Sequence, residues 1–166
     1  MGNLTTILLV GGYAWISWQD FKNREVYLIS YLPVFVLVAV RYVYYPHPDS
    51  SFILVNLYIT GIIIAMLLLI YLVRYGTSFF KKIRASVGSG DLLLLPVIIV
   101  SFSPVSFVLF LVISLGTGLS YWLAGRILHS RQTTIPLAGI TTFLLALILI
   151  LRETGWSGPL KNLTIQ

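Results

Sequence analysis

The sequence predicts an all-α integral membrane protein with about six transmembrane helices. Hydrophobic residues make up 58% of the chain and charged residues only 10%, whereas soluble domains carry roughly 25% charged residues. The mean hydropathy is +0.94, so the chain has too little polar surface to cover a water-soluble globule. No polar stretch among the 166 residues is long enough for a soluble domain, and we expect a single polytopic membrane domain over residues 1–166.

Six apolar segments are candidates for membrane helices, which need about 20 residues to cross a bilayer and fewer at a packed or interfacial position. The first three run over residues 4–19, 26–44 and 52–73, and the third is the clearest. The fourth begins within residues 86–91 and ends near 103–104, the fifth covers 105–128, and the sixth covers 135–151. The connections between these segments are short.

The fourth segment is short and follows a glycine-rich stretch, Gly88-Ser89-Gly90-Asp91. From Leu92 to Ser103 there are about 12 residues, or ~18 Å of helix, which is less than the ~30 Å of a bilayer core. We therefore expect residues 88–91 to form a glycine-rich loop that enters the membrane boundary. Irregular backbone at that depth is tolerated where it is buried in protein or lines a wet cavity, so the loop predicts a recess that holds Asp91.

The distribution of Lys and Arg predicts that both termini lie outside the cell. Basic residues are concentrated in cytoplasmic loops, and an N-terminus outside places most of them in the connections after the first, third and fifth segments. The net charge of +6 is explained by these loops, so nucleic acid is not expected as a partner. The inner loops hold Lys22, Arg24, Arg74, Lys81, Lys82, Arg84, Arg126 and Arg131, and the outer side keeps Arg41, Arg152 and Lys161.

This topology places two acids, Asp20 and Asp91, at the cytoplasmic face. Asp20 ends the first segment and Asp91 opens the fourth. Two carboxylates that lie close together share one proton, because like charges repel. The ionised carboxylate can then accept a proton from water, while the protonated one donates to a scissile carbonyl oxygen. Such a pair can hydrolyse a peptide bond without a metal, a cofactor or a covalent intermediate.

The pattern alone leaves other interpretations open. Asp91 beside a glycine-rich turn is typical of a helix N-terminus, and Asp20 could be an interfacial acid paired with Lys22 or Arg24. A small proton-coupled carrier could use the two acids as a proton relay, although transport sites usually lie near the membrane midplane. A non-catalytic subunit of a secretion assembly is a third alternative.

Three motifs resemble those of the type IV prepilin peptidase family, the membrane aspartyl proteases with a GxGD motif. They are Asp20 with Phe21-Lys22-Asn23-Arg24, then Gly88-Ser89-Gly90-Asp91, and Ile135-Pro136-Leu137-Ala138. The chain looks most like the short members that consist of the membrane protease domain alone. The resemblance implies that Asp20 and Asp91 are catalytic and that Gly88, Ser89 and Gly90 shape the site.

The activity implied by this resemblance is removal of the short basic leader from type IV prepilin-like precursors, such as pilin, pseudopilin or archaellin-like proteins. The enzyme would lie in the cytoplasmic membrane with its site on the cytoplasmic side, and it would need no cofactor or metal. Leu93 stands where many members carry Lys, and Val26-Tyr27 stands where many carry Ile-Pro. The chain has no cysteine and no room for the cytoplasmic insertion of larger members, so methyltransferase activity is not expected.

Several basic residues near the two motifs are candidates for contacts with substrate or with anionic lipid: Lys22, Arg24, Lys81, Lys82 and Arg84. His47 and His129 fall on opposite sides of the predicted membrane and cannot form one metal site. Neither histidine is placed to activate Ser17, Ser86 or Ser89, so a serine protease is disfavoured.

Overall fold

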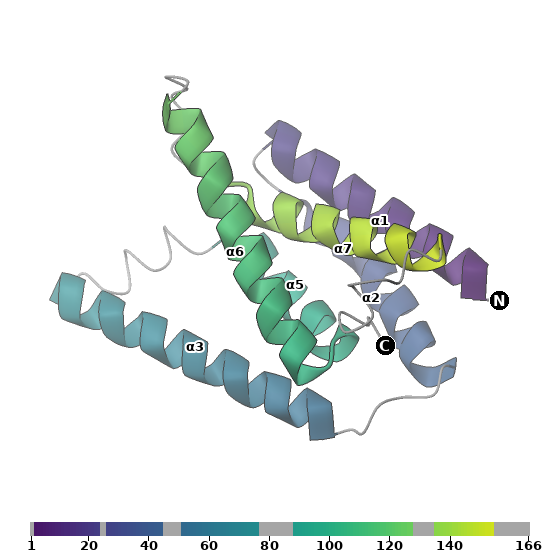
Figure 1. The fold of residues 1–166 in the computed structure, drawn as a ribbon, viewed down its shortest axis with the longest axis horizontal. Helices are drawn as coiled ribbons and strands as arrows, with labels where there is room; N and C mark the ends of the chain where they lie inside the picture. The colour runs from purple at the N-terminus through teal and green to yellow at the C-terminus, as the bar shows by residue number, and fades with distance from the viewer. Residues whose placement is uncertain (1, 24–25, 45–50, 77–87, 128–134, 155–166) are drawn as a thin grey trace.

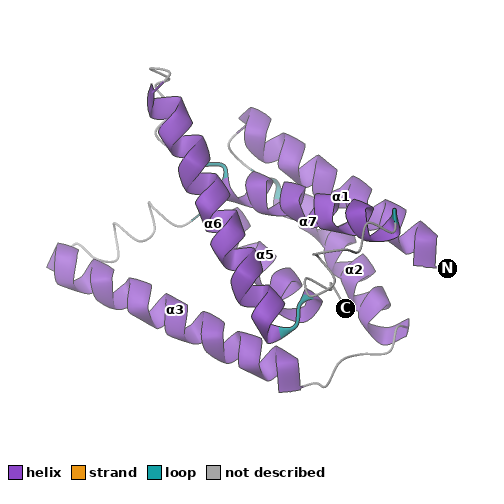
Figure 2. Ribbon diagram, in the orientation of Figure 1, coloured by secondary structure: helices purple, strands orange, loops and turns teal. Residues whose placement is uncertain are grey.

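A computed structural model describes residues 2–23, 26–44, 51–76, 88–127 and 135–154, and these residues form α-helices without a strand among them (Figure 2). The all-α prediction is confirmed, and each helix lies within a few residues of a predicted segment. The helices are α1 (Gly2–Asn23), α2 (Leu28–Tyr44), α3 (Ser51–Tyr75), α5 (Ser89–Ser101), α6 (Pro104–Ile127) and α7 (Leu137–Glu153).

Two helices, α3 and α6, are long and apolar enough to cross a membrane by length and composition. The apolar helix α2 and the apolar part of α5 are shorter. Much of the apolar surface of α3 has no protein neighbour, since every residue from 61 to 70 is exposed. In Figure 1, α3 diverges from α6, so that its C-terminal part lies apart from the rest of the bundle.

Helices α1 and α7 form an antiparallel pair and lie side by side in Figure 1. Near one end of the pair, the Thr6 hydroxyl donates to Glu153 Oε1 at 3.2 Å. Near the other end, the Ser17 hydroxyl donates to the Gly139 carbonyl at 3.0 Å. Helix α2 packs against α1 in the antiparallel sense and approaches it closely, because a Cβ at Gly12 would lie 2.8 Å from a Val34 methyl group.

The buried core lies where α1, α2, α5, α6 and α7 meet. The rings of Phe102 and Phe110 stack at 4.8 Å between centroids and join the end of α5 to α6. Gly118 of α6 lies close to α7, with 3.3 Å between its would-be Cβ and Leu137, whereas Gly116 has open space. The largest fully buried side chains are Tyr31, Phe107, Phe110, Leu9, Ile16, Leu94, Leu145, Leu149, Val34, Val97, Asn56 and Thr142.

The glycine-rich segment differs from the prediction of an irregular loop. Helix α5 begins at Ser89, so Gly90 and Asp91 lie in its first turn, whereas Gly88 precedes the helix in extended conformation, with φ −68° and ψ 133°. The Gly88 carbonyl accepts the Leu92 amide at 3.4 Å and closes this turn. Asp91 in the first turn favours helix because its negative charge faces the positive end of the helix dipole. At 13 residues, α5 is about 20 Å long, as short as expected.

Candidate paired-carboxylate site

Asp20 lies in the last part of α1 and is 7% exposed. Its Oδ2 accepts a hydrogen bond from the Gly139 amide of α7 at 2.6 Å, a short bond, as is usual when the acceptor is a carboxylate. Ser17 lies three residues earlier and therefore on the same face of α1, and its hydroxyl donates to the Gly139 carbonyl. Helix α1 thus binds both backbone polar groups of one glycine. Asp20 is a buried acid with a backbone partner rather than an exposed interfacial one.

Position 139 leaves no space for a larger residue. A Cβ there would lie 3.1 Å from both Cβ and Oδ2 of Asp20 and 3.3 Å from the backbone oxygen of Ser17. Contacts this short would displace the carboxylate or the backbone of α1. The close approach of α7 to α1, and the short hydrogen bond to Asp20, therefore depend on glycine.

The amides at the start of α7 explain why acids gather there. The first amides of a helix have no partner within the helix. The Leu137 amide donates to the Ile135 carbonyl at 2.9 Å, and the Ile140 amide donates to Pro136 at 3.0 Å, whereas the helix has no side-chain cap of its own at Pro136. The remaining two amides belong to Gly139, which donates to Asp20, and Ala138, which faces the carboxylate of Asp91.

Asp91 reaches the same place from the first turn of α5. It is half-buried, and a Cβ at Gly88 would lie 3.1 Å from its Oδ2. Asp20 and Asp91 are close enough for their charges to interact. The structure therefore brings together the two acids that the sequence singled out, at the positive end of the α7 dipole, which stabilises negative charge.

The structure describes only some of the other predicted site residues. Gly90 is half-buried between Tyr31 of α2 and Ala138 of α7, and Ser89 lies in the first turn of α5. Lys22 is exposed, with its Nζ 5.9 Å from the centre of the Trp18 ring. Arg24, Lys81, Lys82 and Arg84, as well as His47 and His129, lie outside the described residues.

Three residues of the site were missed by reasoning from sequence. Ser17 carried a signal, because its spacing from Asp20 places both on one helix face, but it was considered only as a nucleophile. Gly139 follows the Ile135-to-Ala138 motif directly and could have been included with it. Tyr31 carried no signal at all, because an aromatic residue in an apolar helix is ordinary, yet its hydroxyl donates to the Gly90 carbonyl at 3.1 Å.

The arrangement has the parts needed for acid–base chemistry: two interacting carboxylates, each facing a backbone amide that can hold it in one orientation. In the part of the chain that the structure describes, no group of three or more His, Asp or Glu side chains is placed to hold a metal ion. Comparisons with protein-family models, with curated proteins and with solved structures found no match to this chain.

Proposed function

We propose that the protein is a membrane aspartyl endopeptidase that removes the short basic leader from type IV prepilin-like precursors. The observation that carries this proposal is the meeting of Asp20 and Asp91 at the start of α7. The two acids come from helices far apart in the sequence, and the chain has only five acids in all. Burial of one acid beside another is costly, so their pairing favours a role in chemistry over a role in stability alone.

A membrane location is supported by the surface of the helices. The run of exposed residues from 61 to 70 of α3 is almost wholly apolar, and an apolar patch of this kind marks a membrane or an interaction surface. The described helices alternate in direction, so α1, α3 and α6 all end at the side where the paired acids lie. We propose a multi-pass protein of six membrane helices with both termini outside.

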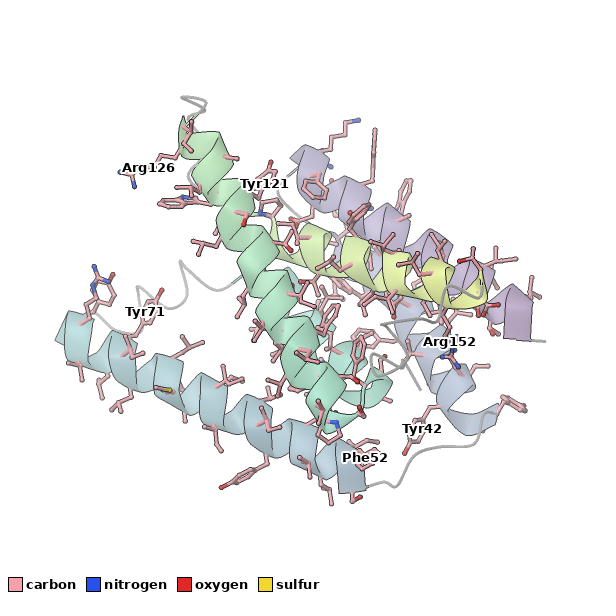
Figure 3. All side chains as sticks on the ribbon, viewed as in Figure 1. Tyr42, Phe52, Tyr71, Tyr121, Arg126 and Arg152 are labelled. Atoms are coloured by element: carbon pink, nitrogen blue, oxygen red, sulfur yellow. The ribbon has the colours of Figure 1, made fainter. Side chains whose placement is uncertain are left out.

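Basic residues at the ends of these three helices support a cytoplasmic position for the site. Each one lies against an aromatic ring, as interfacial residues do. Figure 3 shows Arg126 at the end of α6, and Arg152 near the opposite end of the bundle. The distances from the charged group to the ring centroid are 5.9 Å for Lys22 and Trp18, 5.6 Å for Arg74 and Tyr75, and 5.4 Å for Arg126 and Trp122.

The proposed reaction is direct hydrolysis. One carboxylate, ionised, takes a proton from a water molecule as the water oxygen bonds to the scissile carbonyl carbon, and the other carboxyl group gives its proton to the carbonyl oxygen. In the second step the carbon–nitrogen bond breaks, the leaving nitrogen takes a proton from the pair, and the carbonyl re-forms. The substrate must present an extended segment to the pair, because the amides and carbonyls of a helix are occupied by its own hydrogen bonds.

The first prediction concerns the two acids. We expect Asp20→Asn and Asp91→Asn each to lower kcat by about 10²–10⁴-fold, the usual contribution of general acid–base catalysis. The measurement is cleavage of a prepilin-like precursor by purified protein in detergent, with equal amounts of inserted enzyme. Glu153→Gln is the matched control, because Glu153 lies at the other end of α7, where it accepts a hydrogen bond from Thr6. Cleavage retained by either Asn variant would contradict the proposal.

The same variants test the two alternatives. A carrier is expected to show proton flux that depends on Asp20 and Asp91, without cleavage of any precursor by the wild type. An assembly subunit is expected to bind its partner equally well in both Asn variants. The position of the acids at one end of the helices, rather than midway along them, favours the peptidase over the carrier.

A further inference from the structure

Tyr31 connects the second helix to the turn that carries Asp91. It is 1% exposed, and its hydroxyl donates to the Gly90 carbonyl. That carbonyl has a second lone pair for a bond within its own helix, so the contact costs α5 no hydrogen bond. The hydroxyl also fills the space beside Gly90, since a Cβ at that position would lie 2.9 Å from the phenolic oxygen.

The start of α2 is itself fixed to α1 directly beside Asp20. Gln19 Oε1 accepts from the Ser30 hydroxyl at 3.0 Å and from the Tyr27 amide at 3.4 Å. Gln19 precedes Asp20 in the sequence, Ser30 precedes Tyr31, and Gly90 precedes Asp91. The hydrogen bonds from Ser30 to Gln19 and from Tyr31 to Gly90 therefore connect the two acids through adjacent residues. The charges of Asp20 and Asp91 both act on the Tyr31 side chain, which places it close to the pair.

We infer that Tyr31 is a positioning residue that holds the first turn of α5 so that Asp91 faces Asp20. The glycine at position 90 is required because the Tyr31 hydroxyl occupies the space that a side chain would need. This inference rests on the proposed peptidase activity for its effect on rate, but not for its geometry. In this role Tyr31 acts through the backbone of Gly90, to whose carbonyl its hydroxyl donates.

The kinetic test uses a pair of substitutions that compensate each other. Tyr31→Phe removes the hydroxyl, and we expect kcat to fall on the order of 10-fold with KM changed by less than about 2-fold, since a displacement of 1 Å can cost about 10²-fold. Gly90→Ala introduces the clash and is expected to lower kcat on the order of 10²-fold. The double variant lacks the clashing oxygen and should recover to the level of Tyr31→Phe.

Controls separate positioning from general stability. Tyr58→Phe and Gly61→Ala on α3 are the matched variants, because Tyr58 is exposed and a Cβ at Gly61 has nothing within 4 Å. Rates are compared per folded molecule, with thermal unfolding measured in parallel. A purely structural role would lower the unfolding temperature and leave kcat per folded molecule unchanged. That result, full activity of Gly90→Ala, or a double variant no better than Gly90→Ala would overturn the inference.

A cross-linking test works even if the protein is not a peptidase. The ideal Cβ at position 90 lies 3.5 Å from Ala138 Cβ, within the range of a disulfide, and the chain has no cysteine of its own. In the double variant Gly90→Cys/Ala138→Cys, we expect the Tyr31 hydroxyl to clash with the cysteine side chain at position 90 and so to hinder its approach to position 138. We expect the disulfide to form faster when Tyr31→Phe is added, and Tyr58→Phe to have no effect. Equal rates in all three proteins would overturn the inference, whereas failure of wild-type cleavage would overturn only the proposed function.

Discussion

Gly139 is the residue on which the geometry of Asp20 depends most directly. Its amide and carbonyl are both bound by α1, and its missing side chain leaves space for Asp20. A backbone partner of this kind holds a carboxylate more rigidly than a mobile side chain would. The consequence is that the smallest enlargement at this position should act on stability and on the site together.

Gly139→Ala is therefore expected to destabilise the protein by about 1–3 kcal/mol, the usual cost of overpacking, and to lower cleavage more than Tyr31→Phe does. Thermal unfolding in detergent and the cleavage assay measure the two effects. Gly116→Ala on α6 is the control, because a Cβ there meets nothing within 4 Å, and alanine in a helix is favoured over glycine by up to about 1 kcal/mol. An unfolding temperature of Gly139→Ala equal to that of Gly116→Ala would contradict this account.

At the scale of residues, sequence reasoning identified the two acids but not the groups that hold them. Asp20 and Asp91 stand out because acids are rare in this chain and both fall at segment ends. Gly139 and Tyr31 do not stand out, because their roles arise from contacts between helices that are distant in sequence. The backbone amide that binds Asp20 cannot be identified from the sequence, since every residue other than proline has such an amide.

At the scale of elements, one buried polar residue helps to attach α3 to α5. Asn56 is fully buried, and its Nδ2 donates to the Ile99 carbonyl at 2.9 Å and to the Phe102 carbonyl at 2.7 Å. Ile99 is among the last four residues of α5, whose carbonyls have no partner within the helix. Helix α3 therefore caps the C-terminal end of α5, and most of its remaining surface is exposed.

Asn56→Ala is expected to weaken the attachment of α3, because it leaves these two carbonyls without their donor. Interhelical hydrogen bonds in membrane proteins contribute about 0.6–2 kcal/mol each, so we expect a loss of about 1–3 kcal/mol in the free energy of unfolding. Thr60→Val is the matched control on the same helix, because the Thr60 hydroxyl donates to the Asn56 carbonyl within α3 rather than to α5. Proteolysis and thermal unfolding in detergent distinguish the variants, and equal values for both would contradict the capping role.

Element boundaries show where sequence reasoning was accurate and where it failed. Long apolar segments form helices, and all six were located. The sequence predicts that the first apolar segment ends near residue 19, just before the polar Asp20, whereas α1 continues to Asn23. A buried backbone amide satisfies Asp20 within the helix, so the acid does not end it. The start of α5 at Ser89 lies within the predicted range of residues 86–91, but the loop predicted over residues 88–91 is wrong from Ser89 onward, because these residues already belong to the helix.

At the scale of the whole molecule, the two ends of the helix bundle carry different polar groups. Asn23 and Ile127 lie at the end of the paired acids. Val43 and Thr154 lie at the other end, where Arg41 donates to Thr6 at 3.3 Å and Thr6 donates to Glu153. If the helices cross a membrane as we propose, these ends face opposite compartments.

This topology can be tested with single cysteines, because the chain has none of its own. We expect Val43→Cys and Thr154→Cys to react with a membrane-impermeant maleimide added to spheroplasts, and Asn23→Cys and Ile127→Cys to react only after the membrane is permeabilised. All four positions are exposed, and none carries a charge that sets orientation. The reverse pattern would place the acids outside the cell, and labelling of Asn23→Cys and Val43→Cys from the same side would show that α2 does not cross.

The pairing of α1 with α7 has a consequence for biosynthesis. Asp20 leaves the ribosome early, whereas the Gly139 amide that orients it is made more than a hundred residues later. A nascent chain that ends before α7 contains both acids but lacks the Ala138 and Gly139 amides that orient their carboxylates. The paired-acid site is therefore complete only after α7 has been synthesised and packed against α1. If the protein is the peptidase that we propose, only chains whose synthesis has passed α7 would cleave precursors in the same membrane.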